Sequence, residues 1–193
     1  MKVGVLCEFS GTVRDAFRRR GHDAISCDLL PTESEGPHIQ GDCLGVDWSE
    51  YELLICHPPC TFLCNSGRRW LDSDPMRLAR MEQAAGFFRA MLALPVARIA
   101  VENPIPHALA RERIGAYAQL VQPWQFGTPE RKATCLWLRG LPPLIDTCHT
   151  TKRHPRVHLE SPGPDRWKAR SQFPVGIADA MAVQWGSMER IDT

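Results

Sequence analysis

A short apolar run that ends in two consecutive prolines is the feature that most restricts how this chain can fold. Residues 53–55 have the pattern of a buried strand. Pro58 and Pro59 cannot together extend a sheet ladder or begin a regular helix, so the chain must leave the strand on a rigid extended segment. That segment presents Cys60 beyond the carboxyl end of the strand, where ligands bind in open α/β sheets. Cys60 is therefore a candidate nucleophile; the alternative is a buried apolar cysteine beside a turn, which is the commoner environment of a free cysteine.

Strand-like and helix-like segments alternate along the chain. The helix-like segments are residues 12–20, 75–94, 105–118 and 176–185. The strand-like segments are residues 2–7, 23–27, 39–42, 53–55, 96–101, 119–125 and 134–138. Such alternation predicts an α/β fold of the Rossmann-like kind, with a mostly parallel sheet, right-handed crossovers and helices on both faces.

Composition limits the class of protein. A chain of 193 residues is predicted to form a single domain, residues 1–193, and its net charge of +1 provides no general attraction to nucleic acid or anionic membranes. No apolar run is long enough to span a membrane and no signal peptide precedes the first strand, so a cytoplasmic protein with reduced cysteines is expected. Residues 139–175 are rich in proline and in basic side chains and show no periodicity.

Polar residues follow several of the predicted strands at their carboxyl ends. They are the turn Phe9-Ser10-Gly11, then Asp28, Asp42, Cys60 and the pair Glu102-Asn103. Asp28 follows the glycine turn by about 20 residues, the position of a carboxylate that accepts hydrogen bonds from ribose; a capping aspartate is the alternative. The turn lacks the full G-x-G-x-x-G pattern, which argues against a dinucleotide cofactor. We expect these side chains to converge at one edge of the sheet.

A thiolate beside a carboxylic acid suits addition to an electron-poor ring. Carbon 5 of cytosine is a poor nucleophile, but it gains enamine character when a thiolate adds at carbon 6 and an acid protonates nitrogen 3. It can then attack an activated methyl group, after which a base removes the carbon-5 proton and the thiol leaves. Cys60 and Glu102 are the candidates for the thiolate and the acid.

These motifs, in this order, resemble those of the DNA (cytosine-5) methyltransferases. The resemblance implies a Rossmann-like fold that binds S-adenosylmethionine, with DNA as the partner. It assigns catalysis to Cys60, Glu102, Asn103 and Lys132. It assigns cofactor binding to Glu8, Phe9, Ser10, Gly11, Asp28, Leu29, Asp42 and Pro58. It assigns substrate binding to Pro59, Asn65, Arg68, Arg69, Lys152 and Arg153.

The chain also departs from that family. The Q-x-R-x-R motif expected after residue 129 is replaced by residues 130–134, in which Lys132 alone keeps a matching positive charge. The first motif lacks its second glycine. The basic, proline-rich insertion of residues 139–175 stands where the family carries a sizeable target-recognition domain, as in the compact relatives found in phage genomes. If the chain is phage-encoded, the expected location is the cytoplasm of a bacterial host.

The missing domain leaves several functions open. The acceptor is duplex DNA, single-stranded DNA or, in the first alternative, a free pyrimidine nucleotide. A second alternative is a catalytically inactive relative that binds nucleic acid or a protein partner. A third is a structural zinc site built from Cys56, Cys60 and Cys64 with Cys148, His149, His154 and His158, whose spacing fits zinc motifs loosely; the preferred interpretation has no metal. The oligomeric state is not predicted.

Overall fold

A computed structural model describes residues 1–70, 74–159, 161–164 and 166–189. Its strands are β1 (Lys2–Leu6), β2 (Asp23–Asp28), β3 (His38–Gln40), β4 (Leu53–Cys56), β5 (Arg98–Pro104), β6 (Gln119–Val121) and β7 (Thr134–Arg139). Its α-helices are α1 (Thr12–Arg18), α2 (Pro75–Leu92), α3 (Ala108–Ile114), α4 (Arg156–Leu159), α5 (Arg166–Ser171) and α6 (Val175–Gln184). Short 3-10 helices lie at η1 (Cys43–Gly45), η2 (Asn65–Trp70) and η3 (Pro123–Gln125).

All seven strands belong to one sheet, in the order β3-β2-β1-β4-β5-β7-β6. The five strands from β3 to β5 are parallel to one another, whereas β7 is antiparallel to both β5 and β6. The predicted Rossmann-like α/β sheet is therefore confirmed. The antiparallel pairs are a difference in detail: the chain between β6 and β7 contains η3 and no crossover helix, so β7 runs back along β6.

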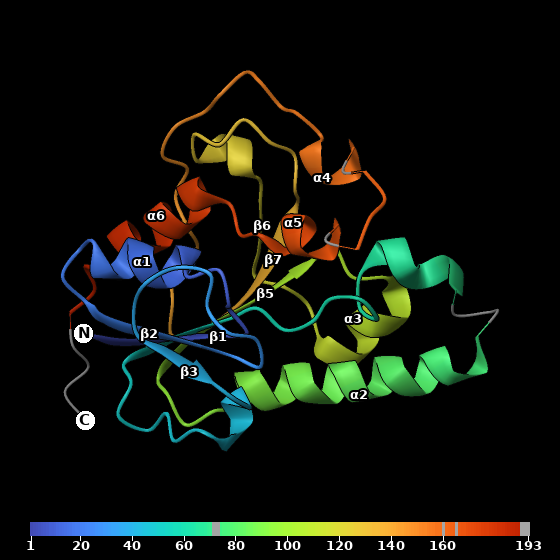
Figure 1. The fold of residues 1–193 in the computed structure, drawn as a ribbon, viewed down its shortest axis with the longest axis horizontal. Coiled ribbons are helices and arrows are strands. Elements are labelled where there is room, and N and C mark those ends of the chain that lie inside the picture. Colours follow the sequence, from blue (N-terminus) through green and yellow to red (C-terminus); the bar gives the residue numbers. More distant parts are fainter. Residues whose placement is uncertain (71–73, 160, 165, 190–193) are drawn as a thin grey trace.

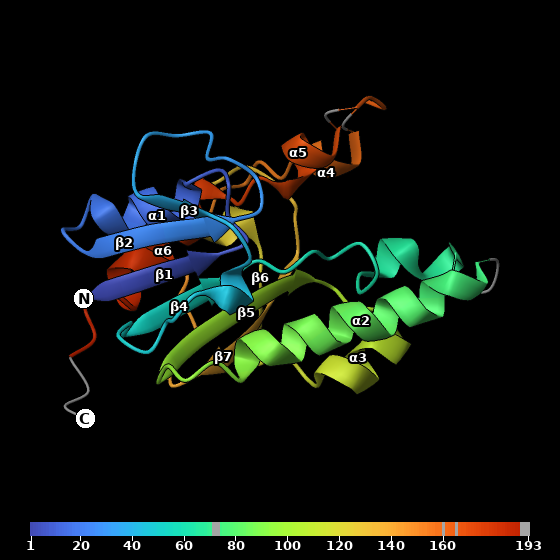
Figure 2. The ribbon, with the colours of Figure 1, turned by 60° about the horizontal axis from the view of Figure 1, so that its bottom comes forward.

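Helices cover both faces of the sheet (Figures 1 and 2). Helices α1 and α6 pack on one face and α2 and α3 on the other. The sequence of β4 is apolar throughout because both of its faces are buried. Leu53 and Ile55 belong to the core under α1 and α6, while Leu54 and Cys56 belong to the core over α2 and α3. A central strand covered on both faces needs no polar alternation.

Helix boundaries differ from the prediction where prolines intervene. The segment expected to be helical from residue 105 stays extended until α3 begins at Ala108, with His107 as its N-cap. The sequence predicts Asp72 or Asp74 as the N-cap of α2. Asp74 takes that place by accepting a hydrogen bond from the Met76 amide at 3.0 Å, and Asp72 lies outside the described residues. The helical spacing of apolar residues also predicts Leu78 in the core, but this side chain is 47% exposed.

The basic insertion is less irregular than predicted. Residues 139–175 contain α4 and α5, and Figure 2 shows both helices beside the edge of the sheet where β1 and β4 end. Within the ranges described above, no helix is both long enough and apolar enough to cross a membrane.

Candidate active site

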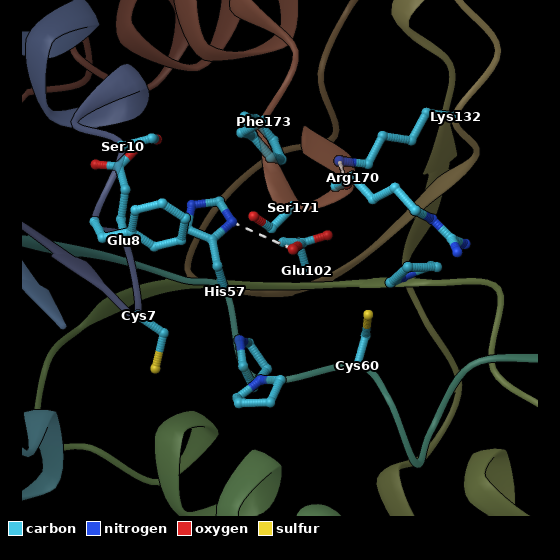
Figure 3. A pocket seen from close by; sticks show the side chains of 14 residues that line it. Cys7, Glu8, Ser10, His57, Cys60, Glu102, Lys132, Arg170, Ser171 and Phe173 are labelled. Carbon is cyan, nitrogen blue, oxygen red and sulfur yellow. Dashed lines mark hydrogen bonds and ion pairs between the residues drawn. The ribbon is translucent and has the colours of Figure 1, made fainter. Parts of the chain in front are cut away.

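A cavity of about 150 Å³ lies at the carboxyl edge of the sheet (Figure 3). Its walls come from the segments after β1 and β4, from the end of β5, from Lys132 just before β7, and from the end of α5 and the residues that follow it. The lining residues are Cys7, Glu8, Phe9, Ser10, His57, Pro58, Pro59, Cys60, Glu102, Pro104, Lys132, Arg170, Ser171 and Phe173. We call this the edge cavity.

Strand direction explains why these distant residues meet. Strands β1, β4 and β5 are parallel, so the turns that follow them lie at the same edge. Strand β7 runs in the opposite direction, and its first residue Thr134 pairs with Pro104 at the end of β5. Lys132, two residues before the start of β7, therefore lies at the same edge.

Cys60 lies half-buried in the edge cavity at the start of a tight turn. The amides of Leu63 and Cys64 both donate to the Cys60 carbonyl at 3.0 Å, so the turn holds Cys64 beside Cys60. The pKa of the Cys60 thiol is raised, first by its hydrogen bond to Cys64 and then by burial. The pKa of Cys64 is lowered to about 5, first by the hydrogen bond from Cys60, with Ser66 also donating. Cys60 thus keeps its proton at neutral pH and has an acceptor in contact.

Glu102 faces His57 across the edge cavity. The Nδ1 atom of His57 lies 3.3 Å from Oε1 of Glu102, and Figure 3 shows this contact beside Cys60. The imidazole packs edge-on against the ring of Phe173, with ring centres 4.7 Å apart. A carboxyl group and a thiol therefore line one cavity, as the sequence predicted, while His57 and Phe173 were not among the predicted site residues.

The start of α1 forms another wall of the edge cavity. Glu8 is buried and accepts hydrogen bonds from the amides of Val13 at 2.6 Å and Arg14 at 3.1 Å, so it closes the N-terminus of the helix. Burial raises the pKa of the Glu8 carboxyl, with His57 and the two amides opposing the shift. Gly11 has φ of +73°, and a Cβ there would lie 2.1 Å from the Ser34 hydroxyl, so only glycine fits.

Lys132 is held at the edge cavity by the C-terminal segment. Its ammonium group donates to the backbone carbonyls of Arg170 at 3.0 Å and Gln172 at 2.6 Å. Burial lowers the pKa of Lys132, while Glu102 and Cys60 act in the opposite direction. Lys132 therefore lines the same cavity as Cys60 and Glu102. Its hydrogen bonds also hold the end of α5 over the cavity.

The two predicted donor-binding aspartates lie outside the lining of the edge cavity. Asp28 ends β2, is half-buried, and accepts a hydrogen bond from the Leu30 amide at 2.9 Å. Asp42 caps η1 by accepting from the Leu44 amide at 3.0 Å. Leu29 is 73% exposed. All three follow β2 or β3, the strands next to β1 on the side of the sheet away from Cys60.

The predicted substrate-binding side chains are more scattered. Pro59 lines the edge cavity, while Asn65, Arg68 and Arg69 are exposed on η2 just beyond Cys60. Lys152 and Arg153 are exposed in the insertion, and the Arg153 guanidinium stacks on the Trp124 ring at 3.9 Å. These two do not line the cavity.

Asn103 is fully buried behind Glu102. Its side-chain amide donates to the Pro104 carbonyl at 2.5 Å, and its Oδ1 has no hydrogen-bond partner among the described residues. The segment it begins supports the Cys60 turn, because His107 Nε2 lies 3.1 Å from the Phe62 carbonyl and the Asn65 amide donates to the Ile105 carbonyl.

The zinc alternative has no cluster to support it in the part of the chain that the structure describes. That part contains no group of three or more His, Cys, Asp or Glu side chains placed to hold a metal ion. Cys56 belongs to the buried core over α2, away from the exposed Cys148. The side chain of His158 lies outside the described residues.

Sequence reasoning missed Arg14, a charged residue that is fully buried. Its guanidinium donates to Ser26, to Thr32, to both oxygens of Ser34 and to the carbonyls of Glu35 and Pro37, and pairs with Asp15. It therefore ties α1 to the loop after β2. Arg14 lies on the same helix face as the apolar residues Val13 and Phe17, and this position in the sequence could have indicated that it is buried.

The roof of the edge cavity was also missed. Phe9 packs against Trp167 of α5 at 5.9 Å between ring centres, and Lys168 pairs with Glu33 at 3.3 Å. The stretch predicted to bind nucleic acid thus folds onto the cavity itself. The hydrogen bonds from Lys132 to the backbone carbonyls of Arg170 and Gln172 hold the same stretch in place.

No protein-family model and no curated protein matches the chain. The solved structures that resemble it include three methyltransferases. One is described as a DNA modification methyltransferase from an Escherichia coli prophage (16% identity, TM-score 0.45, 72% of this chain and 46% of that one). The others are the Entamoeba histolytica methyltransferase EhMeth (17%, 0.49, 84% and 60%) and the S. pombe methyltransferase Dnmt2 (16%, 0.44, 91% and 56%).

The chain thus spans about half the length of these three proteins. Its own sheet order and two helix layers are the basis for classifying it. By that topology, the chain has a Rossmann-like α/β fold, the fold class that its sequence predicted.

Proposed function

We propose that this chain is an S-adenosylmethionine-dependent methyltransferase that modifies carbon 5 of cytosine in DNA through a covalent adduct with Cys60. The observation that carries the proposal is the meeting of Cys60, Glu102 and Lys132 in one cavity beside the glycine turn after β1. A purely structural role would not explain why three separate segments place a thiol, an acid and a cation together at the ligand-binding edge.

The residues of the edge cavity can perform the covalent steps in balance. Cys60 sulfur adds to carbon 6 while its proton passes to Cys64, with which it is hydrogen-bonded. Glu102 gives a proton to nitrogen 3, so carbon 5 becomes an enamine carbon and takes the methyl group. Water then removes the carbon-5 proton, and the carbon–sulfur bond breaks. Nitrogen 3 returns its proton to Glu102, and the proton held by Cys64 returns to the Cys60 sulfur. Lys132 balances negative charge on sulfur and carboxylate during this sequence.

The residues around the glycine turn fit the methyl donor, which would supply an electrophilic methyl group. Gly11 lets the turn after β1 pack closely against Ser34, and the neighbouring Phe9 and Trp167 offer aromatic surface for a purine. Asp28, with its carboxylate at the end of the adjacent strand β2, would accept hydrogen bonds from the ribose hydroxyls. Donor and acceptor sites would therefore adjoin along the same sheet edge.

Replacing Asp28 tests the donor site. Asp28→Asn should raise the dissociation constant for S-adenosylmethionine about tenfold or more, because one acceptor of the ribose hydroxyls is lost while the amide oxygen can still accept from Leu30. Isothermal titration calorimetry measures this directly. Asp47→Asn is the matched control, since Asp47 likewise caps its own loop, accepting from Ser49, but lies outside the proposed site. Equal affinities for the two variants would exclude the ribose role of Asp28.

A second candidate acceptor is a free pyrimidine nucleotide. It is favoured by the position of α5, which covers the edge cavity where the proposed DNA enzyme would need an opening for a flipped base. Both candidates use the same chemistry at Cys60 and Glu102, so they differ in the acceptor alone.

A methyl-transfer assay with labelled S-adenosylmethionine tests the proposal. Duplex DNA, single-stranded DNA and deoxycytidine nucleotides are offered in parallel, and the product nucleoside is identified by mass spectrometry. We expect 5-methyldeoxycytidine from DNA. Product from nucleotides alone would establish the second candidate. Donor binding without product from any acceptor would reject transfer to cytosine and favour a non-catalytic nucleic-acid-binding protein.

A further inference from the structure

His57 occupies an unusual place between two buried or half-buried acids. Its Nδ1 lies 3.3 Å from Glu102 Oε1, and the side chains of the pair are only 10% and 16% exposed. On its other side stands Glu8, whose carboxylate His57 stabilises against burial. Figure 3 shows the ring between these two acids, one from the donor side and one from the acceptor side of the edge cavity.

The ring is fixed in place, and one of its nitrogens is unsatisfied. Phe173 contacts it edge-on with an interplanar angle of 60°. The Nε2 atom is buried and has no hydrogen-bond partner among the residues described. A buried polar atom left unpaired destabilises the fold, so its retention beside a cavity points to a role with ligand bound. Packing alone would be served better by an apolar ring at this position.

We propose, given the proposed function, that His57 is a positioning residue that acts through Glu102. Protonated at Nδ1, it holds one carboxylate oxygen so that the other faces the acceptor ring, and it supplies the proton that Glu102 donates. The proton moves from Nδ1 to Glu102 and on to nitrogen 3 as the Cys60 adduct forms. It returns by the same route when the adduct breaks, so the cycle consumes no proton.

Other titratable and charged groups share this environment. Those that line the same cavity are Cys7 and Glu8 after β1, Cys60 after β4, Glu102 on β5, Lys132 before β7 and Arg170 on α5. An imidazole is the type of side chain whose charge ordinarily changes near neutral pH. Transfer should therefore lose rate as pH rises through the range in which an imidazole ordinarily deprotonates.

Two amide variants separate the functions of the two ring nitrogens. The Asn amide of His57→Asn can reach the place of Nδ1 and donate to Glu102, but it cannot release a proton. The Gln amide of His57→Gln reaches instead toward the place of Nε2 and leaves Glu102 unsupported. We expect kcat to fall about tenfold for His57→Asn and about a hundredfold for His57→Gln, each with a flattened pH profile between pH 6 and 8.5. The donor dissociation constant should change less than threefold.

A measurement on the free protein keeps this inference separate from the proposed function. Urea unfolding of wild type, His57→Asn, Glu102→Gln and the double variant gives a coupling between the two side chains. We expect the coupling, expressed as a ratio of folding equilibrium constants, to be at least threefold larger at pH 5.5 than at pH 8.5, because only imidazolium is charged.

Coupling that is absent, or equal at both pH values, would overturn the proton-carrying pair whatever the enzyme transfers. A wild-type pH profile and kcat in His57→Gln would overturn the positioning role even if the coupling is found. A raised donor dissociation constant with unchanged kcat would reassign His57 to donor binding. Wild type without transfer to any acceptor would remove the proposed function and this role with it.

Discussion

Cys60→Ser is expected to lower methyl transfer at least about 10³-fold while leaving the affinity for S-adenosylmethionine within about twofold of wild type. A hydroxyl is a far weaker nucleophile than a thiolate, and none of the residues that we propose to hold the donor is altered. Transfer is measured by labelled methyl incorporation and donor affinity by calorimetry. Turnover retained in Cys60→Ser would exclude the thiolate mechanism.

An oligonucleotide carrying 5-fluorocytosine sharpens this test. Fluorine at carbon 5 cannot be removed as a proton, so the adduct formed after methyl transfer should persist and add the mass of the oligonucleotide to the chain. Wild type and Cys148→Ser should both form the adduct, since Cys148 is exposed and does not line the edge cavity. Cys60→Ser should not. An adduct mapped to Cys64, the neighbour in the same turn, would move the nucleophile to that residue.

Arg14→Met is expected to destabilise the fold by about 3–5 kcal/mol, lowering the melting temperature by about 10 °C. The arginine is fully buried, and its removal leaves Ser26, Ser34 and the carbonyls of the loop after β2 without their donor. Because that loop follows Asp28, donor affinity should fall as well. Thermal unfolding followed by circular dichroism measures the first effect and calorimetry the second.

Arg19→Met provides the matched control at the C-cap of the same helix. Arg19 pairs with Asp179 at 2.8 Å, but both side chains are more than half exposed, so the loss should be at most about 1 kcal/mol. Similar destabilisation by the two variants would mean that the buried network around Arg14 contributes no more than a surface ion pair.

The sequence by itself determined the sheet and the edge at which function is expected. Residues 53–55 are apolar without interruption because both faces of β4 are covered, and Pro58 and Pro59 end that strand by local stereochemistry. Because the strands are parallel, the residues that end or follow β1, β4 and β5 come to one edge, so the sequence predicted that the turn of residues 9–11, Cys60 and Glu102 would converge there.

Tertiary structure alone decided which other residues complete the site. Lys132 reaches Cys60 because β7 runs antiparallel to β5, a choice set by long-range pairing and invisible in local periodicity. The basic insertion covers the edge cavity because Trp167 packs against Phe9 and because Lys132 donates a hydrogen bond to the Arg170 carbonyl. His57 meets Glu102 because β4 and β5 are neighbours in exact register. Contacts between segments far apart in the chain depend on packing, which no local pattern of side chains specifies.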